Sequence, residues 1–196
     1  MLIPVLGMDP SLNNWGLAHG IYDTESGLIS IGSLDVIQPF LPTGKQTRTN
    51  SKDLARARQL AEQAYAHTQS AAAIFVEVPV GSQNARAMVS YGVCIGILAS
   101  LNAQGIVFFE VSPLEVKQAT VGTKTATKLE IITRAVQRYP NATWPTETKK
   151  GEQRIILSKA EHMADAIGAI EAGIQTEDFK RFLQIWNSNQ RNAHAN

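Results

Sequence analysis

Carboxylates stand inside or at the ends of apolar segments of this sequence, and this pattern restricts how the chain can fold. Asp9 ends the first apolar segment, Glu77 lies inside a second, and Asp165 lies among apolar residues of a late helix. A buried carboxylate destabilises a protein unless it is paired or binds a metal. The fold must therefore bring these groups together, and we expect a divalent-cation site that performs phosphoryl-transfer chemistry.

The order of the periodic segments predicts an α/β domain with a mixed sheet. Three strands come first, with a turn at residues 23–27 between the second and the third, which favours antiparallel pairing. Helices then alternate with two further strands. The predicted strands are 2–9, 15–22, 28–37, 73–78 and 106–111, and the predicted helices are 51–67, 84–104, 113–119, 125–138, 158–173 and 176–188.

The length of 196 residues and the apolar share of 44% suit one domain with a proper core. We expect a single domain over residues 1–188, followed by a disordered tail at 189–196. The segment 139–153 is polar and contains two prolines, so we expect a mobile loop there. Ser158, with Glu161 three residues later, predicts a capping box at the start of the helix that follows this loop.

The net charge is only +1, but the charges are unevenly distributed. The first 44 residues hold four acidic residues and no Lys or Arg, whereas residues 115–159 hold nine basic and four acidic residues. This asymmetry favours a polyanion as partner, although ordinary solvated helix surfaces explain it equally well. Cys94 is the single cysteine, which excludes a disulfide or a cysteine zinc site within one chain.

The N-terminal segment lacks the basic start of a signal peptide and reaches Asp9 too early for one. By inspection, no apolar run is long enough to span a bilayer. We therefore expect a cytoplasmic protein with no secretion signal and no membrane partner.

Asp9, Glu77, His162 and Asp165 form the candidate metal site and catalytic centre. Asp9 and Glu77 end strands that we expect to be neighbours, and ligand sites of open α/β sheets lie at such ends. His162 and Asp165 are three residues apart and share one helix face. Two divalent ions stabilise charge on the attacking and leaving oxygens during phosphodiester hydrolysis. Carboxylates suit Mg²⁺, whereas the imidazole favours Mn²⁺ or acts in acid–base chemistry. Glu110, near the end of the last predicted strand, is a less favoured alternative as a reserve ligand.

Each of the four residues also has an ordinary structural explanation. Asp9 precedes a proline and suits a turn. Glu77 is also consistent with an ion pair to a buried arginine, and Asp165 with a charge on a helix surface. His162, taken alone, is typical of a packed or exposed histidine.

Four sequence blocks, in order, resemble the RuvC-type Holliday-junction resolvases, which have an RNase H-like fold. The resemblance covers roughly residues 3–172, and the order and spacing of the blocks make it specific. The blocks are Gly7–Ser11 with Gly16, Phe75–Glu77 with Asn84, Val116–Gln118 with Val121, Gly122 and Lys128, and His162–Ala166.

The resemblance implies a homodimeric endonuclease that depends on Mg²⁺ or Mn²⁺ and nicks four-way DNA junctions symmetrically. Asp9, Glu77 and Asp165 match the metal-binding carboxylates of the family. His162 matches the fourth position, where members carry Asp or His. The helix predicted at 84–104 is implied to form part of the dimer interface.

Basic residues near the site are the candidate DNA contacts, because Lys and Arg that neutralise phosphates release counterions. The resemblance places Lys117 and Lys128 near the scissile phosphate. Lys124 lies in the same stretch, where a helix beginning near Thr125 presents its N-terminus to a phosphate. Arg86 is a fourth candidate, with an ion pair as the alternative role.

Two departures from the family pattern keep other functions open. Val80 stands where family members often carry an aromatic side chain that wedges into the junction, and the segment 139–153 is longer and more polar than the family loop. Both are compatible with a phage or divergent member in a bacterial or phage-infected cell. The alternatives are a nuclease for forks, flaps or RNA–DNA hybrids, a non-catalytic junction-binding protein, and a fragment of an actin-like ATPase. The chain is short for that ATPase.

Overall fold

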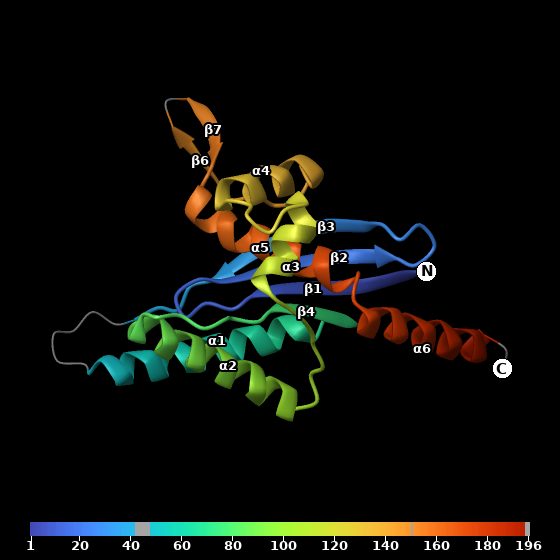
Figure 1. Ribbon diagram of the computed structural model, residues 1–196, viewed down its shortest axis with the longest axis horizontal. Coiled ribbons are helices and arrows are strands. Elements are labelled where there is room, and N and C mark those ends of the chain that lie inside the picture. Colours follow the sequence, from blue (N-terminus) through green and yellow to red (C-terminus); the bar gives the residue numbers. More distant parts are fainter. Residues whose placement is uncertain (42–47, 150, 195–196) are drawn as a thin grey trace.

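A five-stranded mixed sheet forms the centre of the molecule (Figure 1). The computed structural model describes residues 1–41, 48–149 and 151–194, with the backbone only for 190–194. The strand order is β3-β2-β1-β4-β5, in which the first three strands pair antiparallel and β1, β4 and β5 pair parallel. This confirms the predicted fold class. The strands are β1 (Leu2–Asp9), β2 (Trp15–Asp23), β3 (Ile29–Ile37), β4 (Ala73–Glu77) and β5 (Phe109–Val111).

Helices cover both faces of this sheet. In Figure 1, α1 and α2 lie on one face and α3, α4 and α5 on the other, while α6 lies at the end of the molecule that holds both termini. The helices are α1 (Thr49–Thr68), α2 (Ala85–Ala103), α3 (Pro113–Val121), α4 (Lys128–Arg138), α5 (Leu157–Gly173) and α6 (Glu177–His194).

β1 separates two apolar cores, because successive side chains of a strand point to opposite faces. Ile3 and Val5 pack in the core on the α5 side, whereas Leu6 and Met8 pack in the core with α1 and α2. This alternation places Asp9, the last residue of β1, on the α5 side of the sheet.

Two glycines let α5 lie directly on the sheet. A Cβ at Gly7 of β1 would stand 1.9 Å from the carbonyl oxygen of Ala166, and one at Gly16 of β2 would stand 2.1 Å from the carbonyl oxygen of His162. Neither distance is possible for a real side chain, so glycine is required at both positions. The close contact fixes the backbone of His162 beside the end of β1.

Helix starts near the site differ from the predicted ones. α4 begins at Lys128 rather than near Thr125, because Thr127 and Glu130 form a capping box. α5 begins at Leu157 behind Ile156, with no side-chain cap, so the capping box predicted for Ser158 and Glu161 is wrong. The chain instead enters α5 directly from the preceding strand, and the N–H of Ile156 donates to the carbonyl oxygen of Pro145.

A β-hairpin replaces most of the mobile loop predicted at residues 139–153. Strands β6 (Thr146–Lys149) and β7 (Glu152–Ile155) pair antiparallel and project from the body near α4 (Figure 1). Glu147 stands opposite Arg154, and Lys149 stands opposite Glu152. Polar cross-strand pairs give no alternation of apolar and polar residues, so the usual sequence signal of a strand is missing.

The last helix is longer than the sequence predicts, since α6 runs to His194 rather than ending near Ser188. Residues 195 and 196 of the predicted tail lie outside the described residues. The polar run that follows Trp186 carries no apolar periodicity from which a helix could be predicted.

α2 is long and apolar enough, by length and composition alone, to cross a membrane. The sequence prediction that no run has this length is therefore wrong for α2. A helix that packs inside a folded domain passes the same test, and α2 packs against the sheet through Cys94, Ile97 and Leu101.

Candidate functional site

The four predicted site residues line one cavity of about 320 Å³. Met8 of β1 pairs with Val76 of β4 in parallel register, so Asp9 and Glu77 reach the same edge of the sheet. α5, lying over this edge, supplies His162 and Asp165. The complete wall comprises Asp9, Pro10, Ser11, Glu77, Pro79, Val80, Tyr91, Pro113, Val116, Lys117, Lys128, Ile131, Glu161, His162 and Asp165.

Asp9 and His162 are already in contact. The Nδ1 atom of His162 lies 2.7 Å from Oδ2 of Asp9, and both side chains are largely buried. Burial lowers the pKa of His162, but the hydrogen bond and charge of Asp9, together with Glu161 and Asp165, raise this pKa above its usual value overall. Protonated Nδ1 therefore donates to the Asp9 carboxylate, and this bond orients the imidazole.

Negative charge is crowded in the cavity. Burial, followed by the charges of Asp9 and Asp165, raises the pKa of Glu77 to about 9, although Lys117 acts to lower it. Burial and then the charges of Asp9 and Glu161 raise the pKa of Asp165 to about 7. A bound cation would offset this repulsion and favour the ionised carboxylates.

The donor set fits a hard divalent cation, because carboxylate oxygens are the ligands that Mg²⁺ prefers. In the part of the chain that the structure describes, no three His, Cys, Asp or Glu side chains are already placed around one ion position. The metal-binding and catalytic roles of the four residues stay predictions.

Two of the predicted DNA-contacting lysines reach the cavity, and a third does not. Lys117 of α3 and Lys128 of α4 both line the wall. Lys124 lines a separate recess beside Glu115 and Gln175, in the segment between the end of α3 at Val121 and the start of α4 at Lys128. Lys124 is therefore not part of the cavity wall, and the prediction that a helix begins beside it is wrong, whereas its role as a DNA contact stays a prediction.

Arg86 forms the ion pair that was its alternative role. Its guanidinium donates to both carboxylate oxygens of Asp53 at 2.6 and 2.7 Å. The side chain of Asp53 is only 7% exposed and also contacts Arg56. Arg86 therefore joins α2 to α1, and it is not part of the cavity wall.

Of two further acidic residues and one aromatic residue, two line the cavity and one does not. Glu110 lines a recess between β5 and α2 with Ile95 and Asn102 and is not part of the cavity wall, so the structure does not support the less favoured alternative of a reserve ligand. Glu161 and Tyr91 line the cavity itself, and sequence reasoning missed both. The position of Glu161 next to His162 was the available signal, whereas no local pattern distinguishes Tyr91 from a packed residue of α2.

No protein-family model matches the sequence, and no curated protein matches it. Solved structures do match. T. thermophilus RuvC in complex with a Holliday junction substrate has 19% sequence identity and a TM-score of 0.59, over 87% of this chain and 92% of that one. This chain has the RuvC-type fold.

Two further structures agree with this assignment. A second structure, of Thermus thermophilus RuvC, has 20% identity and a TM-score of 0.58, over 88% of this chain and 92% of its own. The yeast mitochondrial Holliday junction resolvase Ydc2 has 13% identity and a TM-score of 0.55, over 93% and 85%. At these identities the likeness establishes the RuvC-type fold, and function depends on the site.

Proposed function

We propose that this protein is a divalent-metal-dependent endonuclease that resolves four-way DNA junctions by paired symmetric nicks. The observation that carries the proposal is the convergence of Asp9, Glu77, His162 and Asp165 on one cavity at the strand ends of a RuvC-type fold. A neighbouring structure, T. thermophilus RuvC, holds a Holliday junction substrate, which supports branched DNA as the ligand.

The residues of the cavity divide into a metal-binding group and a phosphate-binding group. Asp9, Glu77 and Asp165 would hold divalent ions, which activate water and offset charge on the phosphodiester oxygens. The Asp9 carboxylate also orients His162 through their hydrogen bond. Lys117 and Lys128 place positive charge on the same wall, where a DNA phosphate approaches.

The decisive experiment compares an immobile four-way junction, a fork and a linear duplex, each end-labelled, with Mg²⁺, Mn²⁺ or EDTA. We expect paired symmetric nicks in the junction that disappear with EDTA. Asp9→Asn should abolish cleavage and largely retain junction binding, because it removes a metal ligand. Asp178→Asn, on exposed α6, is the matched control and should cut normally. Cleavage by Asp9→Asn at the wild-type rate would refute the assignment of Asp9.

A broader branched-DNA nuclease is the second candidate, and Val80 favours it. This side chain is 55% exposed and lines the cavity where the family often has an aromatic side chain. A valine offers no π-face for stacking on a base. Equal or faster cleavage of the fork than of the junction would favour this candidate. Binding without cleavage of any substrate would favour a non-catalytic junction-binding protein.

We also propose that the active species is a homodimer that associates through α2. Only 22% of the apolar stretch of α2 is buried in the chain, and Met88, Val89 and Ile95 are exposed on it. Several exposed apolar side chains on one helix are typical of an interface. Light scattering that detects only a 21.3 kDa species at micromolar protein, with and without junction DNA, would refute the dimer.

A further inference from the structure

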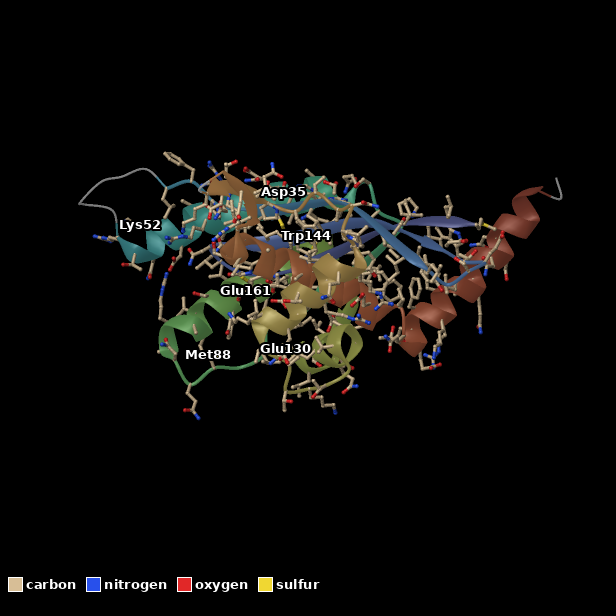
Figure 2. The ribbon with its side chains drawn as sticks, turned by 90° about the horizontal axis from the view of Figure 1, so that it is seen from above. Asp35, Lys52, Met88, Glu130, Trp144 and Glu161 are labelled. Carbon is tan, nitrogen blue, oxygen red and sulfur yellow. The ribbon has the colours of Figure 1, made fainter. Side chains whose placement is uncertain are left out.

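Glu161 is an acidic residue of the cavity to which the proposed mechanism gives no role. It lies on α5, next to His162, and its side chain is 25% exposed. Figure 2 labels Glu161, which appears above Met88 of α2 and Glu130 of α4 in that view. It caps no helix, and its Oε1 atom instead contacts the ammonium group of Lys128.

The two lysines of the cavity differ in their partners. Lys128, the first residue of α4, is held by Glu161 across the gap between α4 and α5. Lys117 of α3 forms no ion pair with any carboxylate in the described residues. One lysine is therefore available to a phosphate at once, while the other must first leave a carboxylate.

The contact between Glu161 and Lys128 is of a kind that an incoming phosphate can break. The Lys128 side chain is 74% exposed, so the ammonium remains hydrated and can turn toward solvent. Exposed ion pairs contribute little net free energy, whereas DNA presents many phosphates and releases counterions when a lysine neutralises one. The carboxylate and the phosphate thus compete for the same ammonium.

We propose that Glu161 is an internal competitor of DNA phosphate, which holds Lys128 at the cavity until DNA binds and then releases it. The inference rests on the proposed function, because the competing ligand is a phosphate of the DNA substrate. Glu161 lowers the affinity for any DNA that engages only Lys128, so productive binding depends on the remaining contacts. Selectivity gained through a repulsive group is a general device of recognition.

A double-mutant cycle with Glu161→Gln and Lys128→Gln tests this coupling. Junction and linear duplex binding are measured by fluorescence anisotropy in EDTA, where metal-dependent cleavage is absent, and again with Ca²⁺. Glu161→Gln should bind both DNAs more tightly, by roughly two- to fivefold, the range that corresponds to one exposed ion pair. Lys128→Gln should bind more weakly, and Glu161→Gln added to Lys128→Gln should change the affinity little.

Control variants separate the specific contact from a general change of charge. Glu177→Gln breaks a similar contact with Lys180 on α6 and should leave DNA affinity unchanged. The gain from Glu161→Gln should shrink as salt rises, because salt screens the exposed groups. The free energy of unfolding of Glu161→Gln should stay close to that of the wild type, since the lysine partner is mostly exposed and the amide can still accept a hydrogen bond.

Two results would overturn the role of Glu161. One is an unchanged or weaker affinity in Glu161→Gln, and the other is an equal gain in the presence and absence of Lys128. In both cases the wild type still binds the junction, so the proposed function stands. A wild-type protein that binds neither the junction nor the fork would instead refute the proposed function.

Discussion

α5 and α2 lie on opposite faces of the sheet and are both apolar, yet only α5 is buried (Figure 1). Eleven of the 17 residues of α5 are buried, against four of the 19 residues of α2. The apolar content of a helix therefore does not decide its burial. The neighbouring elements decide it, because α5 lies between the sheet and the helices α3 and α4, whereas α2 packs mainly against the sheet and α1.

The two helices are held in place by different kinds of contact. The backbone of α5 lies directly on Gly7 at Ala166 and on Gly16 at His162, so the helix and strand backbones touch. α2 packs through one apolar stripe and is joined to α1 by the ion pair of Arg86 with Asp53. The close contact of α5 positions two site residues, whereas the exposed surface of α2 remains available to a partner.

The largest expected effect is on the α5 contact. Gly7→Ala should destabilise the protein by about 3 kcal/mol or more, because a Cβ there meets the backbone oxygen of Ala166. The matched change on the other face is Gly92→Ala in α2, where a Cβ meets nothing within 4 Å. It should stabilise the helix by about 0.5–1 kcal/mol. Urea unfolding of both variants measures the difference, and equal effects would contradict the comparison.

The next largest effect should be the change of stability with pH, which has opposite directions for the groups on the two faces of the sheet. The pKa of Glu77 is raised to about 9 and that of Asp165 to about 7. At a pH above the usual pKa of a carboxyl group, the folded state therefore binds more protons than the unfolded state. In EDTA, stability should therefore fall as pH rises from about 5 toward 9. Mg²⁺ should raise the melting temperature more at pH 8 than at pH 5, and Glu77→Gln should reduce the alkaline loss.

Asp53, on the α2 side, should respond to pH in the opposite direction. The hydrogen bonds from Arg86, against the effect of burial, lower the pKa of Asp53 below its usual value. Its contribution to stability is present above that usual value and is lost as pH falls further. Calorimetric scans at acidic and alkaline pH distinguish the two groups. A single acidic loss with no alkaline loss would contradict the crowding of carboxylates in the cavity.

Arg86→Gln should have an intermediate effect on stability and little effect on DNA. Loss of the two hydrogen bonds to Asp53 should destabilise the protein by about 1–2 kcal/mol, since Arg56 still compensates part of the charge. Junction affinity should change less than about twofold, because the ion pair holds Arg86 away from the cavity wall. Lys117→Gln is the contrasting variant, with weaker junction binding and near-normal stability.

The smallest effect on stability should come from the exposed surface of α2. Ile95→Glu should change the free energy of unfolding by no more than about 0.5 kcal/mol, since the side chain is already exposed. It should nevertheless reduce the dimer fraction in light scattering. Ile185→Glu, at an exposed apolar position of α6, is the control and should leave the dimer intact. Unaltered association in Ile95→Glu would place the dimer contact elsewhere.

The sequence by itself determined where the five strands of the sheet lie along the chain and three of the site's acidic residues. Segments with alternating apolar residues or with continuous apolar runs predicted all five strands of the sheet. A strand that is buried on one face or on both faces leaves such a pattern in the sequence. Asp9 and Glu77 were recognisable since they interrupt or end such segments. His162 and Asp165 were recognisable since their spacing places them on one helix face.

The tertiary structure alone decided the contacts that involve distant segments. The bond of His162 to Asp9 joins residues 153 positions apart, and the contact of Glu161 with Lys128 spans a helix boundary that the local sequence misplaced. The polar β6–β7 hairpin and the ion-paired role of Arg86 were also settled by pairing across space. Local patterns record whether a side chain is buried, but a polar group's partner depends on how the elements pack.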